Sequence, residues 1–265
     1  MFATSGSAQL AYSSTGTGDP VLLIHAGVTD RRSWKYLSPR LEPDHRVVAY
    51  DQRGYGESRT YTPEPWSRHA DALAVMDAAG LERAAVVGCS IGGGAAIDLT
   101  LAHPDRVSKL VLIAAGVSGA PWLEEYPGVF GERLATLEEA EQAEDLAEVN
   151  RLEAWVWLDG ASSPEGRVGG ADRELFLEMN GIALTADDPG ELQRPEEAWD
   201  RLGQIGVPTL VLSGELDLPD QLPVDQGLTE RIPDARLVKL PGVAHLPHLE
   251  NDETCLAAIT DFLKP

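Results

Sequence analysis

The chain has 265 residues, of which 43% are hydrophobic and 24% are charged, a composition typical of a globular protein with one large α/β domain. Lys and Arg number 21 against 43 Asp and Glu, so the formal net charge is −22. Such a chain has no basic patch to neutralise phosphates, which excludes nucleic acid and anionic membranes as expected partners.

No run approaches the roughly 18 apolar residues that a membrane span requires. The first seven residues have neither the charged nor the apolar region of a signal peptide, so we expect a cytoplasmic protein. Cys89 and Cys255 are too few for a disulfide framework in a chain of this length. We expect both cysteines to be reduced and buried.

Apolar runs that alternate with helical patterns predict a mostly parallel sheet with helices on both faces. The expected strands, in chain order, are 8–13, 21–24, 47–50, 84–88, 107–114, 207–212 and 235–240. The expected helices are 33–41, 66–79, 91–103 and 254–263, the last with Asn251 as its N-cap. In such sheets the ligand site lies beyond the carboxyl ends of the strands.

Residues 118–202 interrupt this alternation. The segment is rich in Glu, Leu and Ala, contains five prolines and shows no strand pattern. It predicts a helical cap inserted into an α/β core of residues 1–117 and 203–265. We expect large apolar side chains of the cap both to pack on the core and to supply the wall of a substrate pocket. The candidates are Trp122, Tyr126, Trp155, Trp157 and Met179.

The expected strand 84–88 and the helix that follows it meet at Ser90, in the run Gly88-Cys89-Ser90-Ile91-Gly92. A bare G-x-S-x-G is often a surface turn. Between a strand and a helix it predicts a nucleophile elbow, in which a strained serine projects its hydroxyl above the sheet. Glycine on both sides removes Cβ atoms that the sharp turn would press into backbone. We expect Ser90 to be the nucleophile, with Cys89 pointing back into the core.

A serine hydroxyl needs a base in contact with it and a third group that orients the base. Asp217 and His245 each follow an expected strand, and the order Ser, Asp, His is that of this elbow type. Both have neighbours of the same chemistry. We interpret Glu215 as a loop carboxylate, Asp220 as the cap of the next helix, and His248 as a packing residue beneath its loop.

Acyl transfer also needs two donors directed at the oxyanion of the tetrahedral intermediate. The backbone N–H of Ile91, directly after the nucleophile, is the first expected donor. The loop after strand 21–24 supplies the second, with Gly27 favoured over Val28. On this interpretation His25 positions the loop and does not act as a base.

These motifs together closely resemble the α/β-hydrolase superfamily: His25-Ala26-Gly27, Asp51-x-Arg53-Gly54-x-Gly56-x-Ser58, Gly88-x-Ser90-x-Gly92-Gly93, Gly214-Glu215-x-Asp217 and Gly242-x-x-His245. The chain looks most like its cap-bearing branch of small esterases, enol-lactonases and carbon–carbon bond hydrolases. The resemblance implies a mostly parallel sheet of eight strands, a triad of Ser90, Asp217 and His245, and neither a cofactor nor a metal. Serine at position 90 excludes the usual haloalkane dehalogenases and epoxide hydrolases, whose nucleophile is an aspartate.

We therefore expect a serine hydrolase that cleaves a small apolar carboxylic ester or lactone through an acyl-enzyme on Ser90. Two alternatives stay open. The same triad serves carbon–carbon bond hydrolases and perhydrolases, and a hydrolase scaffold also serves as a ligand receptor. Specificity lies in the cap, whose residue types fit many apolar groups, and no motif indicates an oligomeric state.

Overall fold

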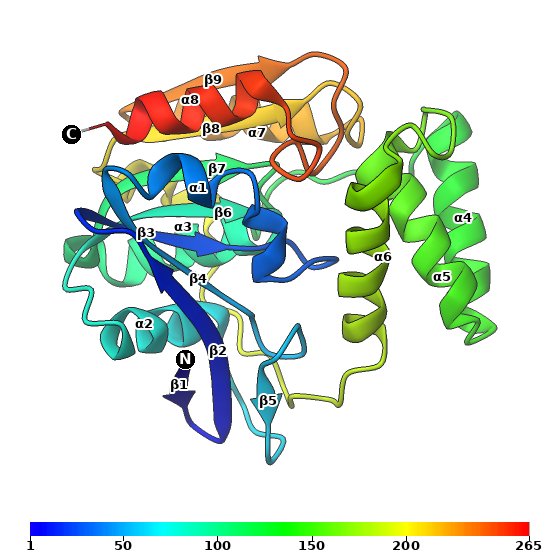
Figure 1. The fold of residues 1–265 in the computed structure, drawn as a ribbon. Coiled ribbons are helices and arrows are strands. Elements are labelled where there is room, and N and C mark those ends of the chain that lie inside the picture. The colour runs from blue at the N-terminus through cyan, green and yellow to red at the C-terminus, as the bar shows by residue number, and fades with distance from the viewer. Residues whose placement is uncertain (265) are drawn as a thin grey trace.

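The computed structural model describes residues 1–264 and is built on one sheet of nine strands (Figure 1). The strands are β1 (Phe2–Ser5), β2 (Ala8–Thr15), β3 (Asp19–Ile24), β4 (His45–Tyr50), β5 (Arg59–Thr60), β6 (Ala84–Cys89), β7 (Val107–Ile113), β8 (Thr209–Gly214) and β9 (Ala235–Leu240). Their order is β1-β2-β4-β3-β6-β7-β8-β9, and β5 pairs with β2 outside this order. The predicted mostly parallel sheet is confirmed. It has nine strands instead of eight because the two-residue β5, too short to give a sequence pattern, joins it.

Six neighbouring strands run parallel, namely β4, β3, β6, β7, β8 and β9. At the edge of the sheet, β2 pairs antiparallel with β4 and β1 pairs antiparallel with β2. From β3 the chain moves to β4 on one side and later returns to β6 on the other side. The loops after β3 and β6 therefore leave the sheet at the point where the strand order reverses. Ligands of open α/β sheets bind at such a point.

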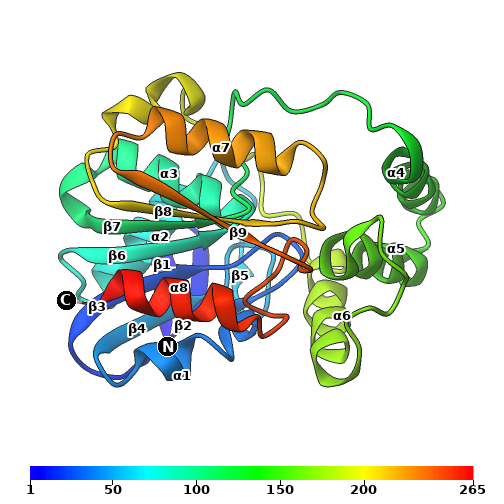
Figure 2. The ribbon, with the colours of Figure 1, turned by 90° about the horizontal axis from the view of Figure 1, so that it is seen from above.

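Helices cover both faces of the sheet, as predicted (Figure 2). One face carries α2 (Arg68–Ala78), α3 (Ile91–Ala102), α7 (Gln221–Arg231) and the 3-10 helix η4 (Trp199–Gln204), and the other carries α1 (Ser38–Leu41), α8 (Glu253–Leu263) and the 3-10 helix η1 (Arg31–Trp34). A further 3-10 turn, η2 (Pro104–Arg106), precedes β7. Alternate residues of β3 point to the two faces, so that Leu22 and Ile24 join one core cluster while Val21 and Leu23 join the other. No helix within residues 1–264 is long and apolar enough to cross a membrane.

The segment between β7 and β8 carries a separate group of helices beside the sheet (Figures 1 and 2). They are α4 (Gly128–Gln142), α5 (Leu146–Glu153), the π-helix η3 (Ala154–Gly160) and α6 (Gly170–Leu184). The chain then returns along the core, where it forms two backbone hydrogen bonds with Trp66. The backbone N–H of Trp66 donates to Glu191 O at 3.0 Å, and Trp66 O accepts the N–H of Gln193 at 2.6 Å. We call residues 118–202 the cap below, and its status as a domain stays a prediction.

The N-cap of α8 is Asp252, whose Oδ1 accepts the N–H of Cys255 at 2.7 Å. The prediction of Asn251 was therefore wrong by one residue. Asn251 has a φ of 56° and turns the chain before the helix begins. Asn and Asp are equally good N-caps, so composition alone does not choose between neighbours.

Candidate active site

Ser90 lies in the turn between β6 and α3 with φ 55° and ψ −120°, the strained conformation that a nucleophile elbow predicts. Positions 88 and 92 have room only for glycine, because a Cβ atom there would overlap neighbouring backbone. A Cβ on Gly88 would lie 2.3 Å from Gly92 O, and a Cβ on Gly92 would lie 2.3 Å from Ile24 O. The Ser90 side chain does not cap α3, so its hydroxyl is not used to stabilise the helix.

His245 and Asp217 are hydrogen-bonded partners at the carboxyl ends of β9 and β8. The distance from His245 Nδ1 to Asp217 Oδ2 is 2.8 Å, and both residues are buried. Because Nδ1 faces the carboxylate, Nε2 is the ring nitrogen available to accept a proton. The Cys89 thiol lies 3.6 Å from His245 O, which places the loop of His245 against the elbow.

The neighbouring carboxylates do not reach His245. Glu215 is exposed. Asp220 lies at the N-cap position of α7, but its side chain does not cap that helix, so our interpretation of it was wrong. Its carboxylate instead accepts the N–H of Leu123 and the hydroxyl of Tyr126, each at 2.8 Å, and so anchors the start of the cap. Within residues 1–264, no group of three His, Cys, Asp or Glu side chains could hold a metal ion.

Two other nucleophile or base candidates lie in the core. His248 is fully buried and its ring stacks on Trp34 with 4.2 Å between centroids, which confirms it as a packing residue. Burial lowers the pKa of His248 to about 3, so its imidazole is neutral near pH 7. Burial also raises the pKa of the Cys89 thiol, and a protonated buried thiol is a poor nucleophile.

The loop after β3 is held by its own histidine. His25 Nδ1 donates to Ala26 O at 2.7 Å, and Nε2 accepts the N–H of Gln52 at 2.9 Å. Burial lowers the pKa of His25 to about 4, so the ring is neutral and both nitrogens are engaged. His25 therefore positions the loop, as predicted.

The same contacts orient the peptide that joins Ala26 to Gly27. Ala26 O also accepts the N–H and the hydroxyl of Thr29, each at 3.2 Å. In a trans peptide the N–H points opposite to the C=O, so the Gly27 N–H is directed away from these three donors. A Cβ on Gly27 would lie 3.1 Å from Ile91 Cδ1, which places the two expected oxyanion donors on neighbouring residues.

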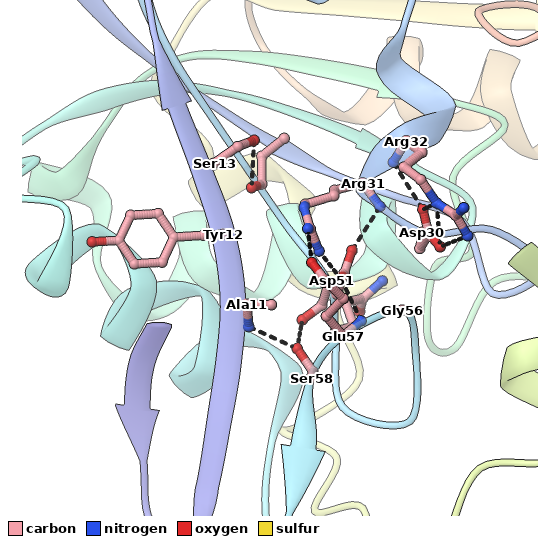
Figure 3. A network of polar contacts seen from close by, with 12 residues as sticks. Ala11, Tyr12, Ser13, Asp30, Arg31, Arg32, Asp51, Gly56, Glu57 and Ser58 are labelled. Atoms are coloured by element: carbon pink, nitrogen blue, oxygen red, sulfur yellow. Dashed lines mark hydrogen bonds and ion pairs between the residues drawn. The ribbon is translucent and has the colours of Figure 1, made fainter. Parts of the chain in front are cut away.

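The loop after β4 contacts the segment that follows β3 and holds it in place through Asp51 (Figure 3). The buried Asp51 carboxylate accepts the backbone N–H groups of Arg31 at 2.9 Å and Glu57 at 2.8 Å, and it pairs with the Arg31 guanidinium. A Cβ on Gly56 would lie 2.2 Å from Asp51 Oδ2, so glycine lets the turn close over the carboxylate. Burial raises the pKa of Asp51 to about 6.

Two of the aromatic candidates in the cap lie beside the site. The Trp157 ring lies 4.8 Å from the His245 ring, measured between centroids. Trp157 belongs to the π-helix η3, and such helices occur frequently at functional sites. Trp122 lines a groove that begins at Ile91, and its Nε1 donates to Val117 O.

The remaining candidates have partners within the protein. Trp155 lies under the guanidinium of Arg133, whose Cζ is 3.3 Å from the ring centroid. Met179 is fully buried, and its Sδ accepts the N–H of Asp30 at 3.4 Å. Tyr126 donates to Asp220, as described above. These contacts join the cap internally and to the core, and a role of these three residues in substrate binding stays a prediction.

Sequence reasoning missed a pair that joins the cap to the loop of His245. Arg167, in the cap, lies 2.6 Å from Glu250 Oε2 and also donates to Gly242 O at 3.1 Å. Glu250 Oε1 accepts the N–H of Ala244 at 2.8 Å. The Arg167 guanidinium further donates to the carbonyl of Asp159, at the end of η3. No local pattern could have indicated this pair, because the partners are far apart in the sequence.

Comparisons with known proteins agree with this geometry. A sequence profile described as the alpha/beta hydrolase fold matches residues 19–252. The chain belongs to the α/β-hydrolase family. It is 37% identical to 2-hydroxymuconate semialdehyde hydrolase from Pseudomonas sp. (strain CF600), over 44% of each protein. It is 29% identical to 2-hydroxy-6-oxo-6-phenylhexa-2,4-dienoate hydrolase from Comamonas testosteroni, over 96% of this chain and 90% of the relative.

Among solved structures, this α/β hydrolase is similar to a thermophilic esterase from Thermogutta terrifontis. The TM-score is 0.74 and the identity 26%, with 99% of this chain and 97% of the esterase covered. The predicted family and fold are thus confirmed, and the α/β hydrolases it resembles include an esterase and carbon–carbon bond hydrolases.

Proposed function

We propose that this α/β hydrolase cleaves a small carboxylic ester or lactone through an acyl-enzyme on Ser90. One observation carries the proposal. The His245–Asp217 pair, 2.8 Å apart, belongs to a loop that touches the elbow, where Ser90 holds a strained φ of 55°. Nucleophilic catalysis by serine needs a base, an acid that orients the base, and a serine whose hydroxyl is free to react. The Ser90 hydroxyl is free in this sense because it does not cap α3.

In the first half of the reaction, His245 Nε2 takes the Ser90 hydroxyl proton while the oxygen attacks the carbonyl carbon. Asp217 stays ionised, fixes the proton on Nδ1 and stabilises the imidazolium. The N–H groups of Ile91 and Gly27 donate to the oxyanion. Ile91 is the first residue of α3, so its N–H has no partner within the helix.

Collapse of the intermediate expels the alcohol, which takes the proton from His245 and leaves an ester on Ser90. Water then gives a proton to His245 and attacks this ester, and the acid departs as Ser90 recovers its hydrogen. No hydrogen bond joins Ser90 to His245 among residues 1–264 without substrate. Catalytic hydrogen bonds of this type often tighten only in the substrate complex.

A second candidate is hydrolysis of a carbon–carbon bond in a dienoic diketone by the same triad. The similarity to the Comamonas testosteroni hydrolase, over 96% of this chain, favours it. Substrate preference separates the two: comparison of kcat/KM for short p-nitrophenyl esters, a lactone and a dienoic diketone identifies the bond that is cleaved. Loss of the preferred activity in Ser90→Ala supports the triad mechanism, and wild-type turnover in that variant would contradict it.

A further inference from the structure

A groove of about 540 Å³ begins at Ile91, the residue after the proposed nucleophile, and follows α3. One wall comes from α3 itself and another from the segment that follows β7; a third comes from residues 192–198 of the cap. The apolar part of the lining includes Ile91, Ala95, Ile97, Val117, Trp122 and Leu192. The groove therefore offers an apolar site that starts next to the proposed oxyanion donor.

Two arginines, Arg68 and Arg194, also line this groove. Arg68 Nη1 donates to the neutral amide oxygen of Gln52 at 3.3 Å, and its guanidinium lies over the Trp66 ring at 5.3 Å. The nearest acidic residue of α2, Asp71, is occupied by Arg53 at 2.8 Å. Within residues 1–264, neither groove arginine forms an ion pair, in a chain with 43 acidic residues against 21 basic ones.

The placement of Arg68 is unfavourable without an anion. It is the first residue of α2, and a cation at a helix N-terminus opposes the helix dipole. Burial and the nearby Arg194 guanidinium also lower the pKa of Arg68. An anionic group in the groove would offset both costs.

Arg68 is also connected to the proposed oxyanion loop. Its partner Gln52 donates through Nε2 to His25 O at 2.8 Å and through its backbone N–H to the His25 ring. Arg68 is therefore joined through one residue, Gln52, to the loop that carries Gly27.

Two carboxylates line the groove as well, Asp98 and Glu197. Burial raises the pKa of Asp98 to about 6, and Arg201 is the cation that opposes this shift. Glu197 lies against Gly119, at the segment that follows β7. With two cations and two carboxylates on its walls, the groove suits a singly charged head better than a phosphate, which carries nearly two charges.

We propose that Arg68 and Arg194 bind a free carboxylate of the substrate, so that the enzyme prefers esters or lactones of apolar acids that carry a second carboxylate. A guanidinium matches a carboxylate through two parallel N–H donors. The two arginines would also offset the repulsion that a protein of net charge −22 exerts on an anionic substrate. This inference rests on the proposed hydrolase function and specifies its substrate class.

The test uses a matched pair of substrates, 4-nitrophenyl hydrogen adipate and its neutral methyl ester. The readout is the ratio of kcat/KM for the anionic ester to that for the neutral ester. We expect a ratio above one in the wild type, and a ratio lower by about tenfold in Arg68→Gln, since hydrogen bonds to charged groups are worth about 10-fold or more. Arg194→Gln, at an exposed position, is expected to lower the ratio about threefold.

Arg83→Gln is the matched control, because it removes one positive charge from an exposed site outside the groove and should keep the wild-type ratio. A wild-type ratio below one would overturn the inference. So would equal losses on both esters in Arg68→Gln, which would make Arg68 a positioning residue acting through Gln52. If Arg68→Gln does not fold, Arg194→Gln alone decides. Absence of Ser90-dependent turnover on either ester would instead contradict the proposed function itself.

Discussion

Arg167→Met breaks the ion pair that joins the cap to the loop of His245. The Glu250 side chain is 4% exposed and that of Arg167 is 22% exposed, so little water can replace the lost partner. Breaking a buried pair by removing one side costs roughly 3–5 kcal/mol. The partial exposure of Arg167 favours the lower end, and we expect a loss of about 3 kcal/mol in the free energy of unfolding.

The assay is urea unfolding followed by circular dichroism, in which a loss of this size lowers the midpoint by about 1 M. Burial already raises the pKa of Glu250, and removal of Arg167 raises it further. The orphaned carboxylate then takes up a proton as the pH falls, so the difference from the wild type should shrink toward acid pH. Activity is a second readout: kcat/KM should fall about tenfold, because Gly242 and η3 lose their common partner.

Arg151→Met is the matched control. Arg151 pairs with Glu148 and with Glu165, and the three side chains are 40%, 39% and 35% exposed. Exposed pairs of this kind contribute about 0.5 kcal/mol. Equal midpoint shifts in Arg167→Met and Arg151→Met, or wild-type activity in Arg167→Met, would refute the reasoning.

Two further substitutions test the packing around the site. Gly92→Ala places a Cβ 2.3 Å from Ile24 O and 2.5 Å from His25 O, so we expect the free energy of unfolding to fall by about 3 kcal/mol or more. In Gly206→Ala the new Cβ has no atom within 4 Å, and its stability should stay near that of the wild type. Thermal denaturation compares the two variants, and similar stabilities would contradict the reasoning. His248 has a pKa lowered to about 3 against 6.5 for the ordinary side chain, so the unfolded state binds more protons in this window and stability falls as the pH drops through it. In acid titrations His248→Leu should lose about 2.5 kcal/mol less than the wild type between pH 7 and 4.5, and an unchanged loss would disprove this role.

The sequence predicted the elements whose signals are local. The elbow at Ser90 follows from a buried strand, two glycines with no room for a Cβ, and a helix, all within one short run. Asp217 and His245 could be proposed as triad members because each directly follows a strand and the chain order of the motif is fixed. The structure then showed that Asp217, and not Glu215 or Asp220, is the hydrogen-bond partner of His245.

The parts that were not predicted depend on contacts between distant residues. Arg167 meets Glu250 across the boundary of cap and core, and Arg68 meets Arg194 in the groove, although no spacing rule links either pair. Asp220 lies at the N-cap position of α7, yet its carboxylate accepts a hydrogen bond from Leu123, at the start of the segment 118–202. In each case tertiary structure assigns a partner that local sequence cannot specify.

Covalent trapping of Ser90 tests the central claim most directly. The protein is treated with a fluorophosphonate, and the modified peptide is identified by mass spectrometry. We expect one phosphonyl group per chain, bonded to Ser90, with fluoride expelled, no label in Ser90→Ala and much slower labelling in Asp217→Asn, where His245 loses its orienting carboxylate. Label on any other residue, or equally fast labelling in Asp217→Asn, would contradict the proposed triad.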